Sequence, residues 1–292
     1  MKPAKFTYHR AEDVEQAISL LTDLGADAKI LAGGQSLMPM MNFRLARPTA
    51  LVDISGIPGL SHITRQTGGM DLGALATHWQ LEHFSSFPGA LAVVAETAQW
   101  IGHPAIRRRG TIGGSLAHSD PVAEWCVLMT ALNAVVVVGG PGGIREEPVE
   151  AFLRGYFSTS LEANEIVLRV RIPRIPDHAG FDEYARRHGD FAIVMVAVAF
   201  DIVDGRVEGP RVVLGGVGGR PERARGAEQA LAGQRPTKDL FEAAAGIAAA
   251  ETDPASDTLG SAEYRRHLVR TLVDRSCVTA LDRTNTRREG KS

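Results

Sequence analysis

The sequence lacks what several classes of protein require. It has two cysteines, Cys126 and Cys277, among 292 residues, too few for a disulfide framework or for the four ligands of a 2Fe–2S cluster. Lys and Arg total 32 against 34 for Asp and Glu, so the strong basic field of a non-specific nucleic-acid-binding protein is missing. The best apolar run, Ala192–Ile202, is shorter than the roughly 18–20 residues that span a bilayer. No apolar signal segment follows Met1. We therefore expect a cytoplasmic protein with reduced thiols and no transmembrane segment.

The familiar catalytic and phosphate-binding motifs are also missing. We find no G-x-G-x-x-G, G-x-S-x-G, C-x-x-C or H-E-x-x-H. The sequence therefore gives no support for a Rossmann dinucleotide site, a serine-hydrolase nucleophile, a redox dithiol or a zinc-protease site. Gly290-Lys291-Ser292 imitates the end of a P-loop, but Asn285 stands where its first glycine would be. His118 and Asp120 could form an acid–base pair, although no nucleophile or metal motif stands beside them. We predict no catalytic residue and no metal ligand.

Glycine is what the sequence has in excess. Thirty-one residues are glycine, where about 7% of a chain is usual, and many fall into four clusters. The clusters at 139–143 and 215–219 follow short β-branched runs. Such positions are typical of turns, because glycine adopts positive φ without strain. We expect a surface hairpin at 139–143 and a connection from strand to helix at 215–219.

The other two clusters, Gly33-Gly34 and Gly113-Gly114, have a different context. Gly33-Gly34 follows a short apolar strand and precedes a helix predicted over 37–45, with Ser36 placed as its N-cap. That geometry presents free backbone N–H groups to an anion such as phosphate. The stretch Thr111–Ser115 repeats the pattern. Either cluster alone is most often a tight turn, but the pair suits a ligand with two phosphates.

Hydrophobic periodicity predicts mixed helices and strands along the chain. Helices are predicted at 12–24, 37–45, 77–84, 89–101, 121–132, 222–232, 237–251 and 261–283, and strands at 28–32, 51–54, 70–75, 135–138, 166–172, 191–204 and 207–214. Asp120-Pro121 is expected to start the 121–132 helix as N-cap and first residue. Asp204-Gly205 predicts a hairpin. Pro173 and Pro176 mark a domain boundary, and the polar, basic stretch 284–292 is expected to be a disordered tail.

Several strings are together specific enough to identify a family. They are Ala32–Met41, Arg44–Pro48, Gly110–Ser115, Asp120-Pro121 and Arg186–Ala192. With them the chain resembles the FAD-binding medium subunit of molybdenum hydroxylases, the carbon monoxide dehydrogenase/xanthine dehydrogenase group. The resemblance runs from Phe6 to about Leu281.

The resemblance implies an α+β fold with two domains. An FAD-binding domain of the vanillyl-alcohol-oxidase (PCMH) type would span 1–175, with subdomains at about 1–55 and 56–175. A smaller C-terminal α+β domain of the carbon monoxide dehydrogenase flavoprotein type would span 178–283. The resemblance also implies the residues that contact FAD. Asp120 and Glu124 would lie near the adenosine or ribityl portion, and Ile101, Val167, Leu168 and the region around Asp190 would approach the isoalloxazine. The two glycine loops would hold the pyrophosphate with Lys29, Ile30, Leu31, Ala32, Gly33, Gly34, Gln35, Ser36, Leu37, Thr111, Ile112, Gly113, Gly114 and Ser115.

The implied function is electron transfer. FAD on this chain would take electrons from the 2Fe–2S clusters of a small subunit and pass them to a quinone, NAD or another acceptor. A large subunit with the molybdenum–molybdopterin cofactor would oxidise the substrate, in a dimer of heterotrimers. Gln35 stands where carbon monoxide dehydrogenases tend to have His, and Ser115 where Asn is common, so an N-heteroaromatic compound or an aldehyde is favoured over carbon monoxide. A stand-alone FAD-dependent oxidase and a non-catalytic module of the same fold are the alternatives.

Overall fold

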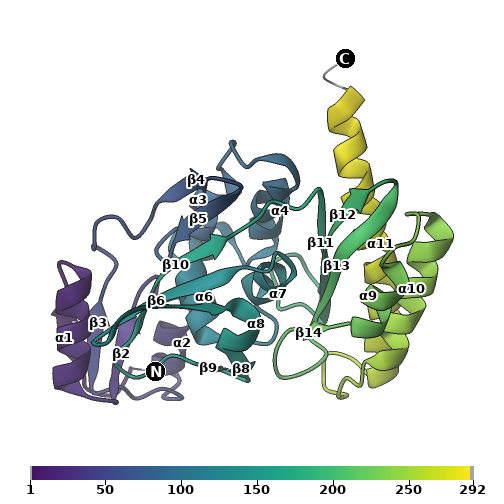
Figure 1. The fold of residues 1–292 in the computed structure, drawn as a ribbon. Helices are drawn as coiled ribbons and strands as arrows, with labels where there is room; N and C mark the ends of the chain where they lie inside the picture. The colour runs from purple at the N-terminus through teal and green to yellow at the C-terminus, as the bar shows by residue number, and fades with distance from the viewer. Residues whose placement is uncertain (1, 290–292) are drawn as a thin grey trace.

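Three main sheets follow one another along the chain, from purple through teal to green in Figure 1. The computed structural model describes residues 2–289, with side chains described as far as Asp282. The tail predicted to be disordered, 284–292, lies outside the residues whose side chains the structure describes. Within the described residues, no helix is both long and apolar enough to cross a membrane.

The first sheet is parallel, with the strand order β1-β3-β2. Its strands are β1 (Thr7–Arg10), β2 (Ala28–Leu31) and β3 (Ala50–Asp53), and its helices are α1 (Val14–Leu24) and α2 (Leu37–Asn42). The Asp13 carboxylate accepts a hydrogen bond from the N–H of Gln16 and caps α1. β1 was not predicted, because its side chains are mostly exposed and show no apolar alternation. α2 is shorter than predicted, because Arg44 takes a left-handed φ of 58° that a helix does not contain.

The second sheet has the order β4-β5-β10-β6-β7. Its strands are β4 (Ile63–Gln66), β5 (Gly69–Gly73), β6 (Val135–Gly140), β7 (Gly143–Pro148) and β10 (Ile166–Ile172). The elements around it are α3 (His78–Glu82), η1 (Gly89–Leu91), α4 (Ala92–Trp100), α5 (Pro104–Arg107), α6 (Ile112–His118), α7 (Glu124–Ala131), α8 (Val149–Phe152), β8 (Leu153–Gly155) and β9 (Ser158–Thr159). Gly140 pairs with Gly143, which confirms the hairpin predicted at 139–143.

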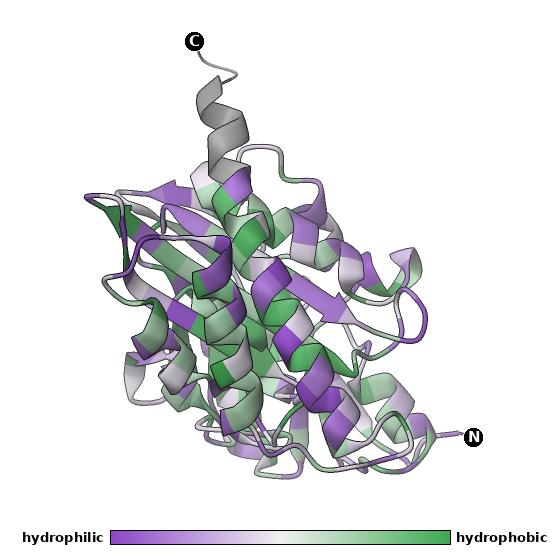
Figure 2. Ribbon diagram, turned by 90° about the vertical axis from the view of Figure 1, so that its right-hand side faces the viewer, coloured by the Kyte–Doolittle hydropathy of each residue, from purple (hydrophilic) through white to green (hydrophobic). Residues whose placement is uncertain are grey.

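The third sheet is antiparallel, with the order β11-β12-β13-β14. Its elements are β11 (His178–Tyr184), β12 (Val194–Val203), β13 (Arg206–Gly215), β14 (Glu222–Arg223), α9 (Arg225–Leu231), α10 (Lys238–Glu251) and α11 (Ala262–Glu289). The helices cover its outer face and alternate between polar and apolar residues in Figure 2. Asp204 and Gly205 have φ values of 51° and 72°, which confirms the predicted hairpin. β11 was not predicted, because the stretch that follows Pro173 and Pro176, as far as Gly180, was interpreted as the domain boundary. A Cβ at Gly180 would lie 2.5 Å from the Ser276 carbonyl oxygen, so this glycine permits close packing against α11.

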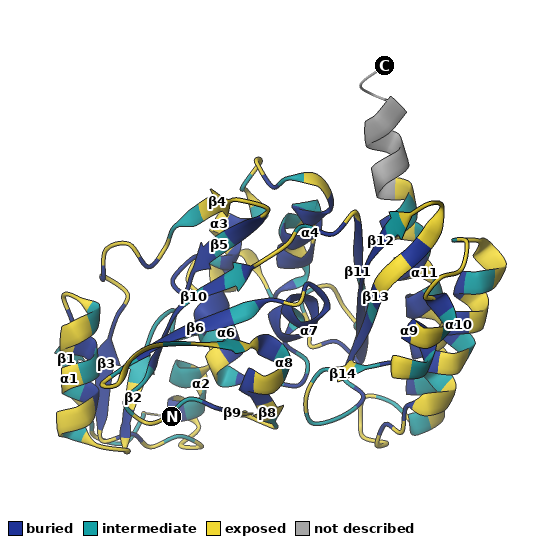
Figure 3. Ribbon diagram, viewed as in Figure 1, coloured by how far each residue is buried: buried dark blue, intermediate teal, exposed yellow. Residues whose placement is uncertain are grey.

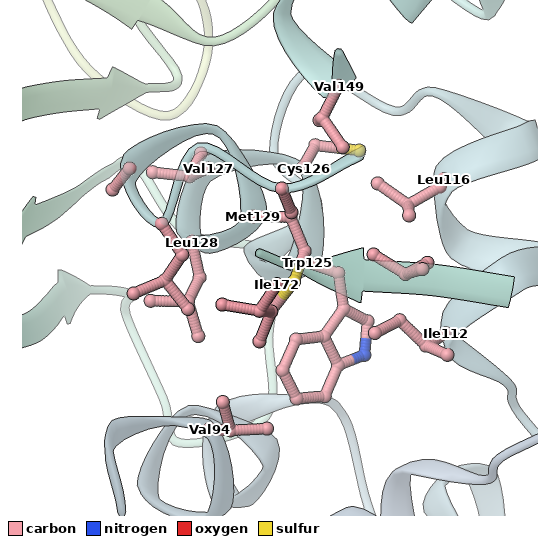
Figure 4. Packing of buried hydrophobic residues seen from close by; sticks show 14 of the residues in the cluster. Val94, Ile112, Leu116, Trp125, Cys126, Val127, Leu128, Met129, Val149 and Ile172 are labelled. Carbon is pink, nitrogen blue, oxygen red and sulfur yellow. The ribbon is translucent and has the colours of Figure 1, made fainter. Parts of the chain in front are cut away.

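α7 lies between the second and third sheets and is buried along most of its length, as Figure 3 shows in dark blue. Every residue from Trp125 to Ala131 is buried. Its side chains pack against Val94, Ile112, Leu116, Val149 and Ile172 (Figure 4). On its other side, a Cβ added at Gly215 of β13 would lie 2.6 Å from the Val127 side chain. α7 therefore fixes the second sheet and its loops relative to the third sheet.

Candidate functional site

The first glycine loop, Gly33–Ser36, joins β2 to α2 and leaves a row of backbone donors free. Gly34 has a φ of 72°, in the region that favours glycine. Among the described residues, none accepts a hydrogen bond from the backbone N–H groups of Gly33, Gly34, Gln35 or Ser36. The loop is half-buried, with Ser36 exposed. Unpaired N–H groups in such a place need water or a ligand as acceptor, and consecutive ones suit an anion.

Ser36 does not cap α2 as predicted. Its backbone is in the right-handed helical region, and its hydroxyl makes no capping hydrogen bond. A capping side chain needs extended backbone at the cap position, and Ser36 has already entered the helical turn. The predicted cap is therefore wrong. The exposed Ser36 hydroxyl is left available to a ligand, as are the neighbouring N–H groups.

The two glycine clusters meet in space although about eighty residues separate them. A Cβ at Gly33 would lie 2.0 Å from the Arg109 carbonyl oxygen and 2.9 Å from Gly110 Cα. A Cβ at Gly114 would lie 3.9 Å from the Ala32 side chain. The sequence predicted that the two clusters serve one ligand, and the structure places them next to each other.

The second glycine cluster nevertheless does not repeat the geometry of the first. Thr111 is the N-cap of α6, and Gly113 and Gly114 lie in that helix's first turn. The N–H of Gly113 donates to the Ala74 carbonyl oxygen at 2.9 Å, that of Gly114 to Thr111 Oγ1 at 3.1 Å, and that of Ser115 to the Thr111 carbonyl oxygen at 3.0 Å. The prediction of a second row of free N–H groups is therefore wrong. Gly114 and the Ser115 side chain remain half-buried and within reach of a ligand.

Asp120 and Glu124 follow α6 on the chain, and only Glu124 belongs to α7. The predicted cap by Asp120-Pro121 is wrong, because α7 begins at Glu124 with Ala123 as N-cap. Asp120 Oδ1 instead accepts a hydrogen bond from the N–H of Val122 at 3.0 Å. Burial raises the pKa of Glu124 to about 7, and the charge of Asp120 adds to this shift. Burial at this end of the site therefore favours the neutral form of the Glu124 carboxyl group.

The alternative of a His118–Asp120 acid–base pair gains nothing from the geometry. Among the described residues, no hydrogen bond joins the two side chains. Burial lowers the pKa of His118, and the Asp120 charge opposes that shift. The His118 ring instead faces Phe157, with 5.0 Å between centroids.

The residues predicted around the isoalloxazine lie in two places. Ile101, at the C-terminal end of α4, is 8% exposed, and Asp190 is exposed. A Cβ at Gly189 would lie 2.9 Å from the Gly102 carbonyl oxygen, so the loops that carry Ile101 and Asp190 touch. Val167 and Leu168 are buried in β10 at an irregularity of its pairing with β6. Ile112 is fully buried, so its side chain faces the core.

Sequence reasoning missed two buried side chains beside the glycine loops, His78 and Arg107. Neither lies in a motif, and Arg107-Arg108-Arg109 has the appearance of an exposed basic run. The sequence did offer one signal for His78: it stands four residues before Glu82, and this spacing places both side chains on one face of a helix.

Among the described residues, no group of three His, Cys, Asp or Glu side chains could hold a metal ion. Both cysteines are buried, and burial raises the pKa of each thiol.

Two family models match consecutive parts of the chain. Residues 4–175 match the model of the FAD binding domain in molybdopterin dehydrogenase, and residues 179–280 match that of the CO dehydrogenase flavoprotein C-terminal domain. The chain is 40% identical over 292 residues to the 6-hydroxypseudooxynicotine dehydrogenase complex subunit alpha of Paenarthrobacter nicotinovorans, with 99% of each chain covered. It is 38% identical to the nicotine 6-hydroxylase medium subunit of the same organism, covering 97% of this chain and 100% of the relative. A solved structure of carbon monoxide dehydrogenase from Hydrogenophaga pseudoflava matches with a TM-score of 0.92 and 38% identity, over 97% of this chain and 99% of the other.

Proposed function

Because the chain belongs to the family of FAD-binding medium subunits of molybdenum hydroxylases, we propose that its FAD carries electrons from the 2Fe–2S clusters of a small subunit to an external acceptor. It is an oxidoreductase subunit with an FAD-binding domain, and the molybdenum and iron–sulfur centres of the family reside on other subunits. The observation that carries the proposal is the Gly33–Ser36 loop, which lies beside the second glycine cluster and whose four backbone N–H groups find no acceptor among the described residues.

The residues present fit FAD. When bound, FAD supplies a centre that exchanges electrons with its partners. The free N–H groups of Gly33–Ser36 hold the pyrophosphate without a lysine, and the hydroxyls of Ser36 and Ser115 add donors. Ile101, whose loop touches that of Asp190, would offer the ring an aliphatic surface. The proposed cofactor-binding set is the one that the family resemblance implied, apart from Ile112 and Gly113, which are buried and whose N–H groups donate to Ala76 and Ala74. The proposed domains span 1–175 and 178–283.

The substrate proposed for the complex is an N-heteroaromatic compound, oxidised on the large subunit. Two relatives carry names that contain nicotine or a pseudooxynicotine, and Gln35 of the first glycine loop supports the same choice over carbon monoxide. The proposed assembly is a dimer of heterotrimers in the cytoplasm.

Flavin content tests the proposal directly. We expect the full chain, produced with its two partner subunits or reconstituted with FAD, to bind one FAD and show flavin absorbance. Gly33→Ala should lose it, because the added Cβ meets the Arg109 carbonyl oxygen. Gly142→Ala is the matched control, since no atom lies within 4 Å of its Cβ position. A colourless wild-type chain that takes up no FAD would overturn the proposal.

A further inference from the structure

The segment 99–110 connects α4 to α6 and supports the first glycine loop. Its last residues, Arg109 and Gly110, are the backbone against which Gly33 packs, with a Cβ position only 2.0 Å from the Arg109 carbonyl oxygen. The position of this backbone therefore decides where the free N–H groups of the loop point. After the last two residues of α4, the segment contains only the four-residue α5, and so it needs tertiary contacts to hold its place.

His78 of α3 supplies the first of these contacts. It is 5% exposed, and its backbone N–H donates to the Gly110 carbonyl oxygen at 2.9 Å. A Cβ at Gly110 would lie 2.6 Å from His78 Nε2, so the imidazole lies directly against this glycine. On its other side, His78 Nδ1 accepts a hydrogen bond from Trp125 Nε1 at 2.9 Å. Figure 4 shows Trp125 projecting from α7 into the core, with its ring nitrogen turned toward Ile112.

The His78 ring is neutral in this position. Burial lowers its pKa to about 3, and the charge of Arg107 adds to the shift. Because Nδ1 accepts the indole proton, the ring carries its own proton on Nε2. The neutral His78 ring, in this one tautomer, therefore packs between Trp125 and Gly110 and fixes the distance between them.

Arg107 supplies the second contact. It is 9% exposed, and its guanidinium donates to the carbonyl oxygens of Gly102 at 2.9 Å, Gln99 at 3.3 Å and Ile101 at 3.4 Å. Its Nε donates to Glu82 Oε2 at 2.8 Å. Glu82 lies one helical turn after His78, so α3 fixes the segment near both of its ends.

We propose that His78 and Arg107 are positioning residues of the FAD site, because together they fix the 99–110 segment and thereby the free N–H groups of the first glycine loop. The inference rests on the proposed function, since FAD is the ligand whose affinity it concerns. Neither side chain is accessible enough to bind FAD itself; each acts through the backbone of the segment.

Two measurements on the full chain test the inference. In the first, His78→Phe keeps an aromatic ring but leaves Trp125 Nε1 without its acceptor. We expect the dissociation constant for FAD, titrated by flavin fluorescence well below the unfolding temperature, to rise about tenfold, and His78→Gln to recover part of the loss by offering an acceptor. His83→Phe is the matched control, because His83 follows α3 as its C-cap, with a side chain 52% exposed, and its Nδ1 is hydrogen-bonded to the Trp79 carbonyl oxygen of that helix.

In the second measurement, the chain without FAD is digested with trypsin. Arg108 and Arg109 are exposed, so cleavage there reports the mobility of the segment. We expect His78→Phe and Arg107→Met to speed this cleavage several-fold, with no change at other sites. A double-mutant cycle with Gly33→Ala should be non-additive, since both changes act at the contact of Gly33 with Arg109.

The outcomes separate the two claims. Weaker FAD binding with faster cleavage at Arg108 and Arg109, while circular dichroism shows a folded chain, supports the inference. A lower melting temperature with unchanged FAD affinity overturns it and leaves the proposed function standing. A wild-type chain that binds no FAD defeats the proposed function, and the inference with it.

Discussion

The two glycine clusters look alike in the sequence, but the structure shows that their backbone N–H groups are hydrogen-bonded differently. At Gly33–Ser36 the backbone N–H groups have no hydrogen-bond acceptor in the part of the chain that the structure describes. At Gly113-Gly114 nearly the same string forms the first turn of α6, and its N–H groups are bonded to Ala74 and Thr111. Both clusters use glycine for close backbone packing, since a Cβ would lie 2.0 Å from the Arg109 carbonyl oxygen at Gly33 and 2.7 Å from the Ala74 carbonyl oxygen at Gly113. The difference between them is the state of their N–H groups, which are bonded within the protein in the second cluster and open to a ligand in the first.

This difference predicts that substitutions in the two clusters fail in different ways. A change in the first loop should act mainly on FAD affinity, and a change in the second mainly on folding stability. Measurements of FAD affinity and of folding stability on the same variants test this difference between the clusters.

The largest effect is expected at Gly33. Gly33→Ala puts a methyl group 2.0 Å from the Arg109 carbonyl oxygen, so either the loop or the 109–110 backbone must move. We expect FAD affinity to fall roughly 100-fold, which corresponds to about 2.7 kcal/mol, as measured by flavin fluorescence titration. An affinity within twofold of wild type would show that the free N–H groups do not hold the cofactor.

Gly113→Ala should instead destabilise the chain. The added methyl group meets both the side chain and the carbonyl oxygen of Ala74, at 2.6 and 2.7 Å, and overpacking of this kind costs about 1–3 kcal/mol. Urea denaturation of the chain without FAD measures the loss. If stability is unchanged and only FAD affinity falls, the second cluster is a binding loop like the first, and the comparison breaks down.

Much of this could be predicted from the sequence, for physical reasons. β10 was predicted to the residue, because a buried run of Ile, Val and Leu ends at a proline. The hairpins at 139–143 and Asp204-Gly205 followed from turn chemistry. Whether the backbone N–H groups of the second cluster are free or bonded could not be predicted. Their acceptors include the carbonyl oxygens of Ala74 and Ala76, which lie about forty residues earlier on the chain. His78 was missed for the same reason, because Trp125 and Gly110 lie far from it on the chain. Arg107 was missed because its burial depends on the packing of α3 against the 99–110 segment, including the bond to Glu82.

A smaller effect separates the two residues that flank the clusters. Thr111 Oγ1 accepts the N–H of Gly114 and caps α6, so Thr111→Ala should cost about 1 kcal/mol of stability. Ser36 makes no such bond, so Ser36→Ala should leave the melting temperature unchanged. Equal losses in both variants, measured by thermal unfolding, would contradict the difference in capping.

The smallest effect concerns pH, and it too divides the site. The first loop offers backbone groups, the Gln35 amide and the Ser36 hydroxyl, none of which titrates near neutral pH. Glu124 follows the second cluster, and burial and the charge of Asp120 raise its pKa to about 7. A raised folded-state pKa means that the stabilising contribution of the neutral carboxyl is complete below about pH 4.5 and is lost as the pH rises through about 7. The ionised carboxylate also repels the pyrophosphate, so FAD affinity should fall roughly threefold between pH 6 and 8. Glu124→Gln should flatten both profiles, while Glu162→Gln, an exposed control, should not. A profile that keeps its slope in Glu124→Gln would place the titrating group elsewhere.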